Sequence, residues 1–117
     1  MGENDNIPQM TPSFENICRK DENGNEYWSS RDLCGAMGYS AYWKFQRVID
    51  KAIKVAGEKG MNVDEHFNQA VDMVKIGNGS FRKVNIFRLS RMACMIVAEN
   101  ANVKKVLVQQ ARDYFTR

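Results

Sequence analysis

The sequence lacks both a membrane-spanning stretch and a segment built for export. No apolar run approaches the roughly 20 residues that a membrane-spanning helix requires. The first 13 residues, MGENDNIPQMTPS, hold two acidic residues and neither lysine nor arginine, whereas a signal peptide starts with basic residues and continues with apolar ones. We therefore expect residues 1–13 to form a disordered leader and residues 14–117 to form one domain with a modest core.

Cysteine and histidine are scarce. The three cysteines, Cys18, Cys34 and Cys94, lie far apart and match neither a disulfide framework nor a paired-cysteine zinc site. We predict free thiols and a cytoplasmic location. His66 is the only histidine and has no ligand spacing around it. A nucleophilic pair of Cys94 and His66 stays open, because only geometry decides it. We assign no catalytic residue and expect a protein without enzymatic activity, metal or cofactor.

Positive charge is distributed unevenly. Residues 1–36 hold three basic and seven acidic residues, whereas residues 37–117 hold 14 basic and seven acidic residues. A basic portion within a near-neutral protein is typical of a site for an anionic partner. The alternative is an ordinary solvated face.

The periodicities and turn signals predict an α+β fold, a single small domain of about five helices with two short β-hairpins. Asn23-Gly24 indicates the first hairpin, between strands near 14–19 and 26–28.

A helix-turn-helix-like unit is predicted next. Ser29 and Asp32 fit a capping box that starts a helix, and Gly38 fits its left-handed end. Ser40 is placed to cap a second helix. The remaining predicted elements are a helix over 62–74 capped by Asn62, a hairpin over 74–89 that turns at Gly77-Asn78-Gly79, a central core helix over 91–100 capped by Ser90, and a helix over 103–115 with Val103, Val106, Leu107, Ala111 and Tyr114 inward.

The second helix of this unit has two opposite faces. On an ideal helix its four basic residues share a sector about 80° wide. They are Lys44, Arg47, Lys51 and Lys54. The apolar stripe on the other side consists of Phe45, Val48, Ile49, Ala52, Ile53 and Ala56. We expect Phe45, Ile49, Ala52 and Ile53 to be buried with Met95, Ile96 and Leu107.

The basic sector suits a helix that lies along a polyanion, since lysine and arginine neutralise phosphates and release counterions. Trp43 and Gln46 lie at the edge of the sector and add a stacking ring and an amide. The alternative is a solvated face beside a helix joint that is packed by aromatic residues.

The sequence resembles a known family from Phe14 to Phe115. The most specific segments are DENGNEYWSSRDL, MVKIGNG followed by LSRMAC, and the break between Asn100 and Asn102. In these segments the sequence is similar to the N-terminal region of the DNA-damage-inducible protein D family, a bacterial group allied to the Bro-N domain of viral and phage antirepressors. The last helix opens with ANVKK, which keeps the lysines of the family pattern but not its proline.

The resemblance implies a DNA-binding domain linked to the SOS response or to prophage regulation. Family members usually continue well past this length, so we expect activities housed further on to be absent. We predict that the nucleic-acid-binding residues are Ser30, Arg31, Tyr42, Trp43, Lys44, Gln46, Arg47, Lys51, Lys54, Lys75, Arg82 and Lys83.

A competing hypothesis is a protein-interaction module that acts on a repressor or a recombination protein. A nuclease is less well supported, because no cluster of acidic metal ligands stands near a lysine at a usable spacing. No heptad seam indicates an oligomeric state, and no feature indicates a membrane partner.

Overall fold

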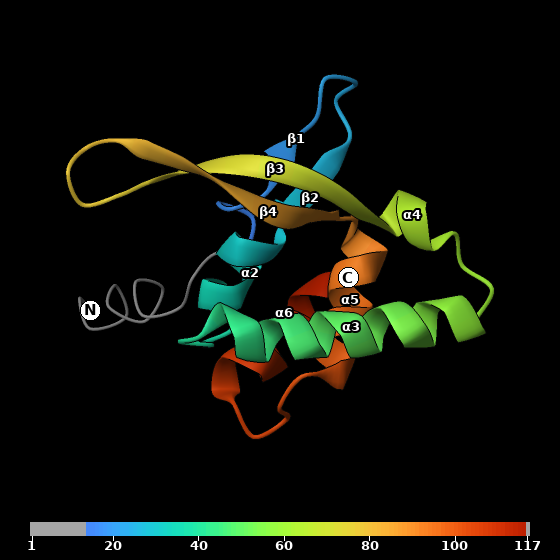
Figure 1. Ribbon diagram of the computed structural model, residues 1–117. Helices are drawn as coiled ribbons and strands as arrows, with labels where there is room; N and C mark the ends of the chain where they lie inside the picture. The colour runs from blue at the N-terminus through green and yellow to red at the C-terminus, as the bar shows by residue number, and fades with distance from the viewer. Residues whose placement is uncertain (1–13, 117) are drawn as a thin grey trace, which may run out of the picture.

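The computed structural model describes residues 14–116 as a four-stranded antiparallel sheet with helices packed against it (Figure 1). The strands are β1 (Arg19–Lys20), β2 (Glu26–Ser29), β3 (Phe67–Lys75) and β4 (Phe81–Leu89). The helices are α2 (Ser30–Ala36), α3 (Tyr42–Glu58), α4 (Val63–His66), α5 (Arg91–Asn100) and α6 (Val106–Phe115). This confirms the predicted α+β class. The leader predicted over residues 1–13 lies outside the described residues.

The sheet has the order β1-β2-β4-β3. Its first hairpin turns at Gly24, as predicted, with a φ of +82°. The first strand is shorter than predicted, because residues 14–17 form a turn, whereas the second covers the predicted residues 26–28 and Ser29. The carbonyl of Phe14 accepts a 2.6 Å hydrogen bond from the Trp28 indole, and its ring packs on Phe115. These contacts hold the start of the described chain against α6 instead of in the sheet.

The segment over residues 62–74 corrects the helix prediction. Asn62 caps a helix as predicted, since its side chain accepts a hydrogen bond from the Glu65 amide, but this helix, α4, ends after one turn at His66. The chain then becomes β3 and pairs with β4 at nine positions. The valine spacing fits a helix, yet valine and phenylalanine are strand formers, and the long-range partner decides between the two structures.

The second hairpin turns where the sequence predicts. Gly79 has a φ of +87°, and the Ile76 amide donates a 2.8 Å hydrogen bond to the Ser80 carbonyl. Strand β3 starts earlier than expected, at Phe67, whereas β4 lies within the predicted hairpin. The end of this hairpin extends beyond the rest of the described chain (Figure 1).

Arg19 ties this hairpin to the remainder of the fold. Its guanidinium donates to Asp32 of α2 at 2.8 Å and to Asp72 of β3 at 3.2 Å. Asp32 therefore pairs with an arginine, although a capping box would direct it to the Ser29 amide. Asp72 also accepts a 2.9 Å hydrogen bond from the Met73 amide.

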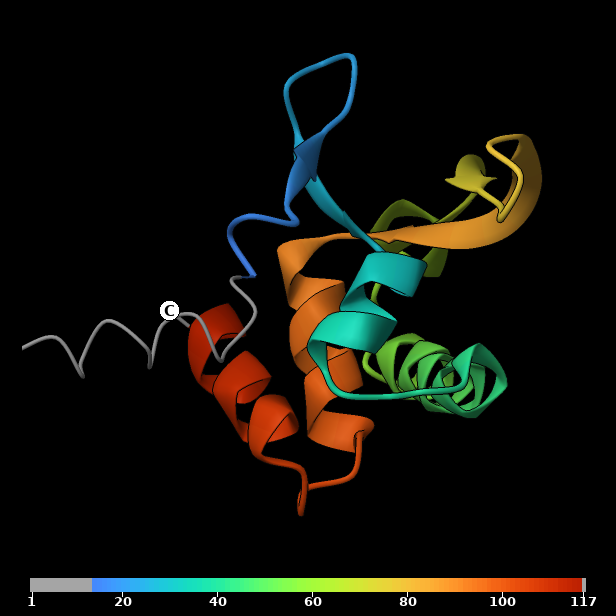
Figure 2. The ribbon, with the colours of Figure 1, turned by 90° about the vertical axis from the view of Figure 1, so that its left-hand side faces the viewer.

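The core lies between the sheet and the helices, with α5 at its centre, flanked by α3 and α6 (Figure 2). This confirms the central place predicted for the apolar helix. Ser90 caps it, as predicted, by accepting from the Ala93 amide. The largest fully buried side chains are Trp28, Phe45, Phe67, Leu33, Met37 and Ile49. Within residues 14–116, no helix combines the length and the apolar character that a bilayer crossing needs.

The joint between α2 and α3 follows the prediction except at one cap. The Ser29 side chain accepts from the Arg31 amide and starts α2. Gly38, at a φ of +83°, ends it, with the Tyr39 amide bonded back to the Cys34 carbonyl. Ser40 does not cap α3, because the helix begins one residue later, behind Ala41, which has no side-chain acceptor.

The apolar stripe of α3 packs inward as predicted. Phe45, Ile49, Ala52 and Ala56 are buried, while Val48 and Ile53 are partly buried. Of the expected neighbours, Ile96 is buried, and Met95 and Leu107 are partly buried.

The last helix starts later and is rotated from the prediction. It begins at Val106, and Val103 and Val106 are exposed while Val108 and Phe115 are buried. The side chain of Asn102 accepts from the Lys104 amide and holds residues 102–105 in a turn. Because each residue advances a helix by about 100°, a shift in the start and the packing changes which residues face inward.

We predict that Gly38→Ala lowers the free energy of unfolding by about 1–3 kcal/mol. A Cβ there would meet Leu107 Cδ1 at 3.1 Å, and the positive φ adds backbone strain. Urea denaturation measures the change.

Gly24→Ala, with similar φ and nothing within 4 Å, isolates the backbone cost. Gly35→Ala, within helix α2, should instead be neutral or stabilising by up to about 1 kcal/mol. Equal losses for Gly38→Ala and Gly24→Ala would show that the Leu107 contact has no influence.

Candidate nucleic-acid interface

The outer side of α3 carries a row of four cations, which we call the basic row: Lys44, Arg47, Lys51 and Lys54. All four are exposed, opposite the buried stripe, as the angular pattern predicts. Within residues 14–116 none of the four forms an ion pair. The neighbouring carboxylate, Asp50, instead accepts a 3.0 Å hydrogen bond from Gln46. The basic row therefore presents its full charge to solvent.

Trp43 lies next to the basic row and is 59% exposed. The Arg47 guanidinium lies 5.2 Å from the centroid of its ring, and the Lys44 ammonium 5.5 Å. Both distances are within the range of cation–π interactions, which keep the ring and the two cations in one cluster. An exposed indole beside cations is the kind of surface on which nucleic-acid bases stack.

Ser30 is fully buried, which corrects its prediction as a nucleic-acid contact. Its hydroxyl lies 2.7 Å from that of Tyr42 and accepts a 3.0 Å hydrogen bond from the Phe87 amide. Burial raises the pKa of Tyr42. The Arg31 guanidinium lies 4.2 Å over the Tyr42 ring. Ser30 therefore positions α3 against α2 and β4, while Arg31 and Tyr42 lie partly exposed at this joint.

Lys75, Arg82 and Lys83 are exposed on the second hairpin. In the register, Lys75 lies opposite Phe81 and Lys83 opposite Met73, so these two lysines share a face, while Arg82 points to the other one. The structure therefore does not gather the three on one face. Figure 2 shows that the outer end of the hairpin and the start of α3 lie on the same side of the molecule.

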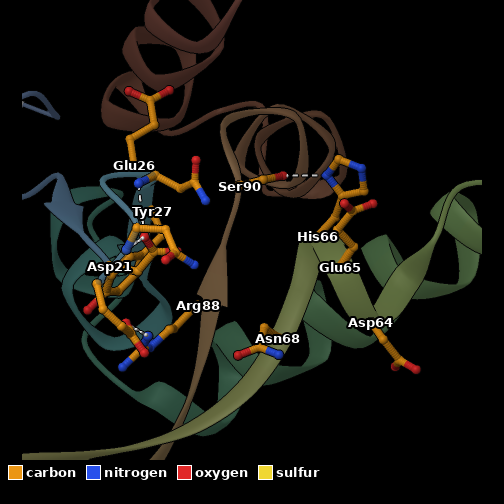
Figure 3. A pocket seen from close by; sticks show the side chains of 12 residues that line it. Asp21, Glu26, Tyr27, Asp64, Glu65, His66, Asn68, Arg88 and Ser90 are labelled. Atoms are coloured by element: carbon orange, nitrogen blue, oxygen red, sulfur yellow. Dashed lines mark hydrogen bonds and ion pairs between the residues drawn. The ribbon is translucent and has the colours of Figure 1, made fainter.

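A hollow of about 630 Å³, which we call the acidic hollow, lies between the β1–β2 loop and α4 (Figure 3). Its lining contains five carboxylates, namely Asp21, Glu22, Glu26, Asp64 and Glu65, against the single cation Arg88 and a histidine. His66 Nδ1 lies 2.6 Å from the Ser90 hydroxyl. Because carboxylates repel phosphates, this hollow does not belong to a nucleic-acid interface.

The candidate chemistry of cysteine and histidine has no supporting geometry. The three cysteines are free, and Cys34 and Cys94 are buried. Burial raises the pKa of Cys94 well above its usual value, which disfavours the reactive thiolate. His66 bonds to Ser90 rather than to a thiol. Among residues 14–116 no three side chains of His, Cys, Asp or Glu come together to hold a metal ion.

A comparison with curated proteins gives one informative match. Over 102 residues, or 87% of its length, the chain is 37% identical to DNA damage-inducible protein D of Escherichia coli (strain K12). The chain is related to DNA damage-inducible protein D. It spans 37% of the length of this relative.

The relation to DNA damage-inducible protein D confirms the resemblance noted in the sequence. No protein-family model matches the chain, so the link to the Bro-N domain stays a prediction. No solved structure matches it significantly either.

One feature of the site escaped the sequence analysis. A cavity of about 180 Å³, which we call the amide cavity, lies between the start of α3 and the β3–β4 hairpin. Its lining residues are Tyr42, Gln46, Gln69, Ala70, Asn85, Ile86 and Phe87. The helix predicted over 62–74 includes residue 69, so the sequence does not predict that Gln69 and Asn85 lie on one face of a hairpin. The alternation of a strand running back from Gly79 is the signal that could have placed both on one face.

We predict that Ser30→Ala lowers the free energy of unfolding by about 1–3 kcal/mol, because it leaves the Phe87 amide without its acceptor. Tyr42→Phe removes only the hydroxyl partner and should cost about 0.5–1.5 kcal/mol. Chemical denaturation of both single variants and the double variant measures the coupling. Additive losses would show that the Ser30 and Tyr42 hydroxyls do not stabilise each other.

The ion pair between Glu26 of β2 and Arg91 of α5 predicts that the free energy of unfolding depends on pH. Arg91 donates to Glu26 at 2.8 and 3.3 Å, and this hydrogen bonding lowers the pKa of Glu26. The stabilisation is therefore present above the usual glutamate pKa, about 4.3, and disappears as the pH falls through the lowered value. Stability measured from pH 6 to pH 3 should fall less steeply in Glu26→Gln. Glu99→Gln, which removes an exposed carboxylate of α5 that forms no ion pair within residues 14–116, should keep the parent slope.

Proposed function

We propose that the chain is a non-enzymatic DNA-binding domain with a role in the response to DNA damage. The observation that carries the proposal is the basic row: four exposed cations on one helix face, without carboxylate partners in residues 14–116. In this arrangement the cations contact consecutive phosphates, because each charge is free to displace a counterion.

The damage-related role rests on the relative. Its printed name, DNA damage-inducible protein D, supports such a role for a chain that is 37% identical to it. We further propose that the domain belongs with the Bro-N antirepressors, in the SOS response or in prophage regulation of a bacterial cell. The free thiols favour action in the cytoplasm.

The neighbouring side chains extend the proposed interface. Trp43 offers an exposed ring, and Gln46 and Arg47, which follow it on α3, are the side chains that we propose reach base edges. On the hairpin we propose that Lys75 and Lys83, which share a face, touch backbone phosphates, and that Arg82 does so from the opposite face.

A second candidate function is a protein-interaction module, and the hairpin is the observation that favours it. Four large apolar side chains are exposed there: Val71, Met73, Ile76 and Phe81. Contiguous exposed apolar residues mark protein–protein contacts. In this alternative the hairpin docks on a repressor or a recombination protein, and contacts with DNA are incidental.

We predict that Arg47→Ala and Lys51→Ala each weaken DNA binding and lower the slope of log affinity against log salt concentration by roughly one. Both side chains are exposed, so the variants should remain folded. The measurement is a titration of labelled DNA at several salt concentrations, with circular dichroism as the check on folding.

Lys104→Ala is the matched control, because it removes an exposed lysine from the turn before α6. It should bind as the parent does. If Arg47→Ala and Lys51→Ala also bind as the parent at every salt concentration, α3 is not the DNA contact, and the protein-interaction function becomes the better account.

A further inference from the structure

The amide cavity carries chemistry that the basic row does not explain. Its lining contains no charged side chain. Gln46, Gln69 and Asn85 contribute carboxamides, each of which offers both hydrogen-bond donors and acceptors. The surroundings therefore suit a neutral ligand that has both kinds of group, and they do not suit a phosphate or a cation.

Two of these amides are free to bind such a ligand. Gln46 donates to Asp50, whereas the side chains of Gln69 and Asn85 make no hydrogen bond within residues 14–116. In the register Gln69 lies opposite Phe87, and Asn85 lies opposite Val71. Gln69 and Asn85 are therefore diagonal neighbours on one face of the hairpin, close enough to contact the same small molecule.

The size of the cavity restricts the ligand further. A volume of about 180 Å³ lies below the roughly 300–1,000 Å³ of pockets that enclose drug-sized molecules. It suits one small planar group, and a double helix cannot enter it.

Cations lie on the same elements as the cavity lining or in contact with it. Arg31 lies over the ring of Tyr42, which lines the cavity. One residue further along α3, Trp43 carries Lys44 and Arg47 against its ring. An anionic chain bound along these cations therefore passes beside an uncharged, amide-lined cavity. A nucleic acid combines the same two kinds of group, because its backbone carries charged phosphates and its bases are neutral and form hydrogen bonds.

We infer that the amide cavity binds one unstacked base of a single-stranded nucleic acid whose phosphates lie along the basic row. The inference rests on the proposed function and specifies its substrate. In a duplex the base edges are paired and the rings stacked, so a base must leave the stack before it can enter. A single strand presents its bases already free, and amide side chains read their edges.

The experiment compares three labelled oligonucleotides by fluorescence anisotropy: a mixed-sequence single strand, the same sugar-phosphate chain without bases, and the duplex. The parent chain should bind the single strand at least about tenfold more tightly than the abasic strand. Gln69→Leu and Asn85→Leu should each reduce this preference several-fold and leave binding of the abasic strand unchanged.

Asn68→Leu is the matched control. Asn68 is an exposed amide on the same strand, but it points to the opposite face and lines the acidic hollow. It should bind all three oligonucleotides as the parent does. Gln69→Glu keeps the size of the side chain and replaces its donor with a negative charge, so it tests the same position if a leucine variant does not fold.

The outcomes separate the two proposals. If the parent binds none of the oligonucleotides, the proposed function fails. If the parent binds the abasic strand or the duplex as tightly as the single strand, the basic row still binds phosphates and the base pocket is overturned. Unchanged preference in folded Gln69 and Asn85 variants overturns it as well.

Discussion

The fold depends on two adjacent serines where β2 becomes α2. Ser29 starts the helix by capping it, and Ser30, fully buried, bonds to an amide of β4 and to the hydroxyl of Tyr42 in α3. A buried hydroxyl must be satisfied, and here one oxygen satisfies groups from two other elements. Because the same residue fixes α2, α3 and the sheet, it sets where the basic row stands relative to the hairpin.

The molecule separates its charges by location. The cations of the basic row form no ion pair within residues 14–116, whereas Arg19 of β1 and Arg91 of α5 are bonded to acids and serve the fold. The acidic hollow lies beside α4, which follows the C-terminal end of α3, whereas Trp43 lies at the N-terminal end of α3. An approaching polyanion is therefore attracted to one region and repelled from another, and this orients it before contact.

Local signals predicted what local forces decide. The sequence predicted several features that depend only on residues within one or two turns. These are the helix caps at Ser29, Asn62 and Ser90, the left-handed conformation of Gly38 and the inward apolar stripe of α3. The valine spacing of residues 67–75 could not predict a strand, because the strand with which β3 pairs lies beyond the turn at Gly79. The amide cavity was missed for the same reason: positions 46, 69 and 85 meet only through the topology.

Strand β3 also poses a problem of self-association that the sequence solves at one residue. It is one of the two edge strands of the sheet, and Val71 and Met73 are exposed on it, so it offers a template on which a second chain could extend the sheet. The carboxylate of Asp72 occupies the Met73 amide and is itself held by Arg19. An added strand would have to displace this carboxylate and bury a charge. Asp72 thus acts as a gatekeeper that lets the chain expose a long strand while resisting growth into aggregates.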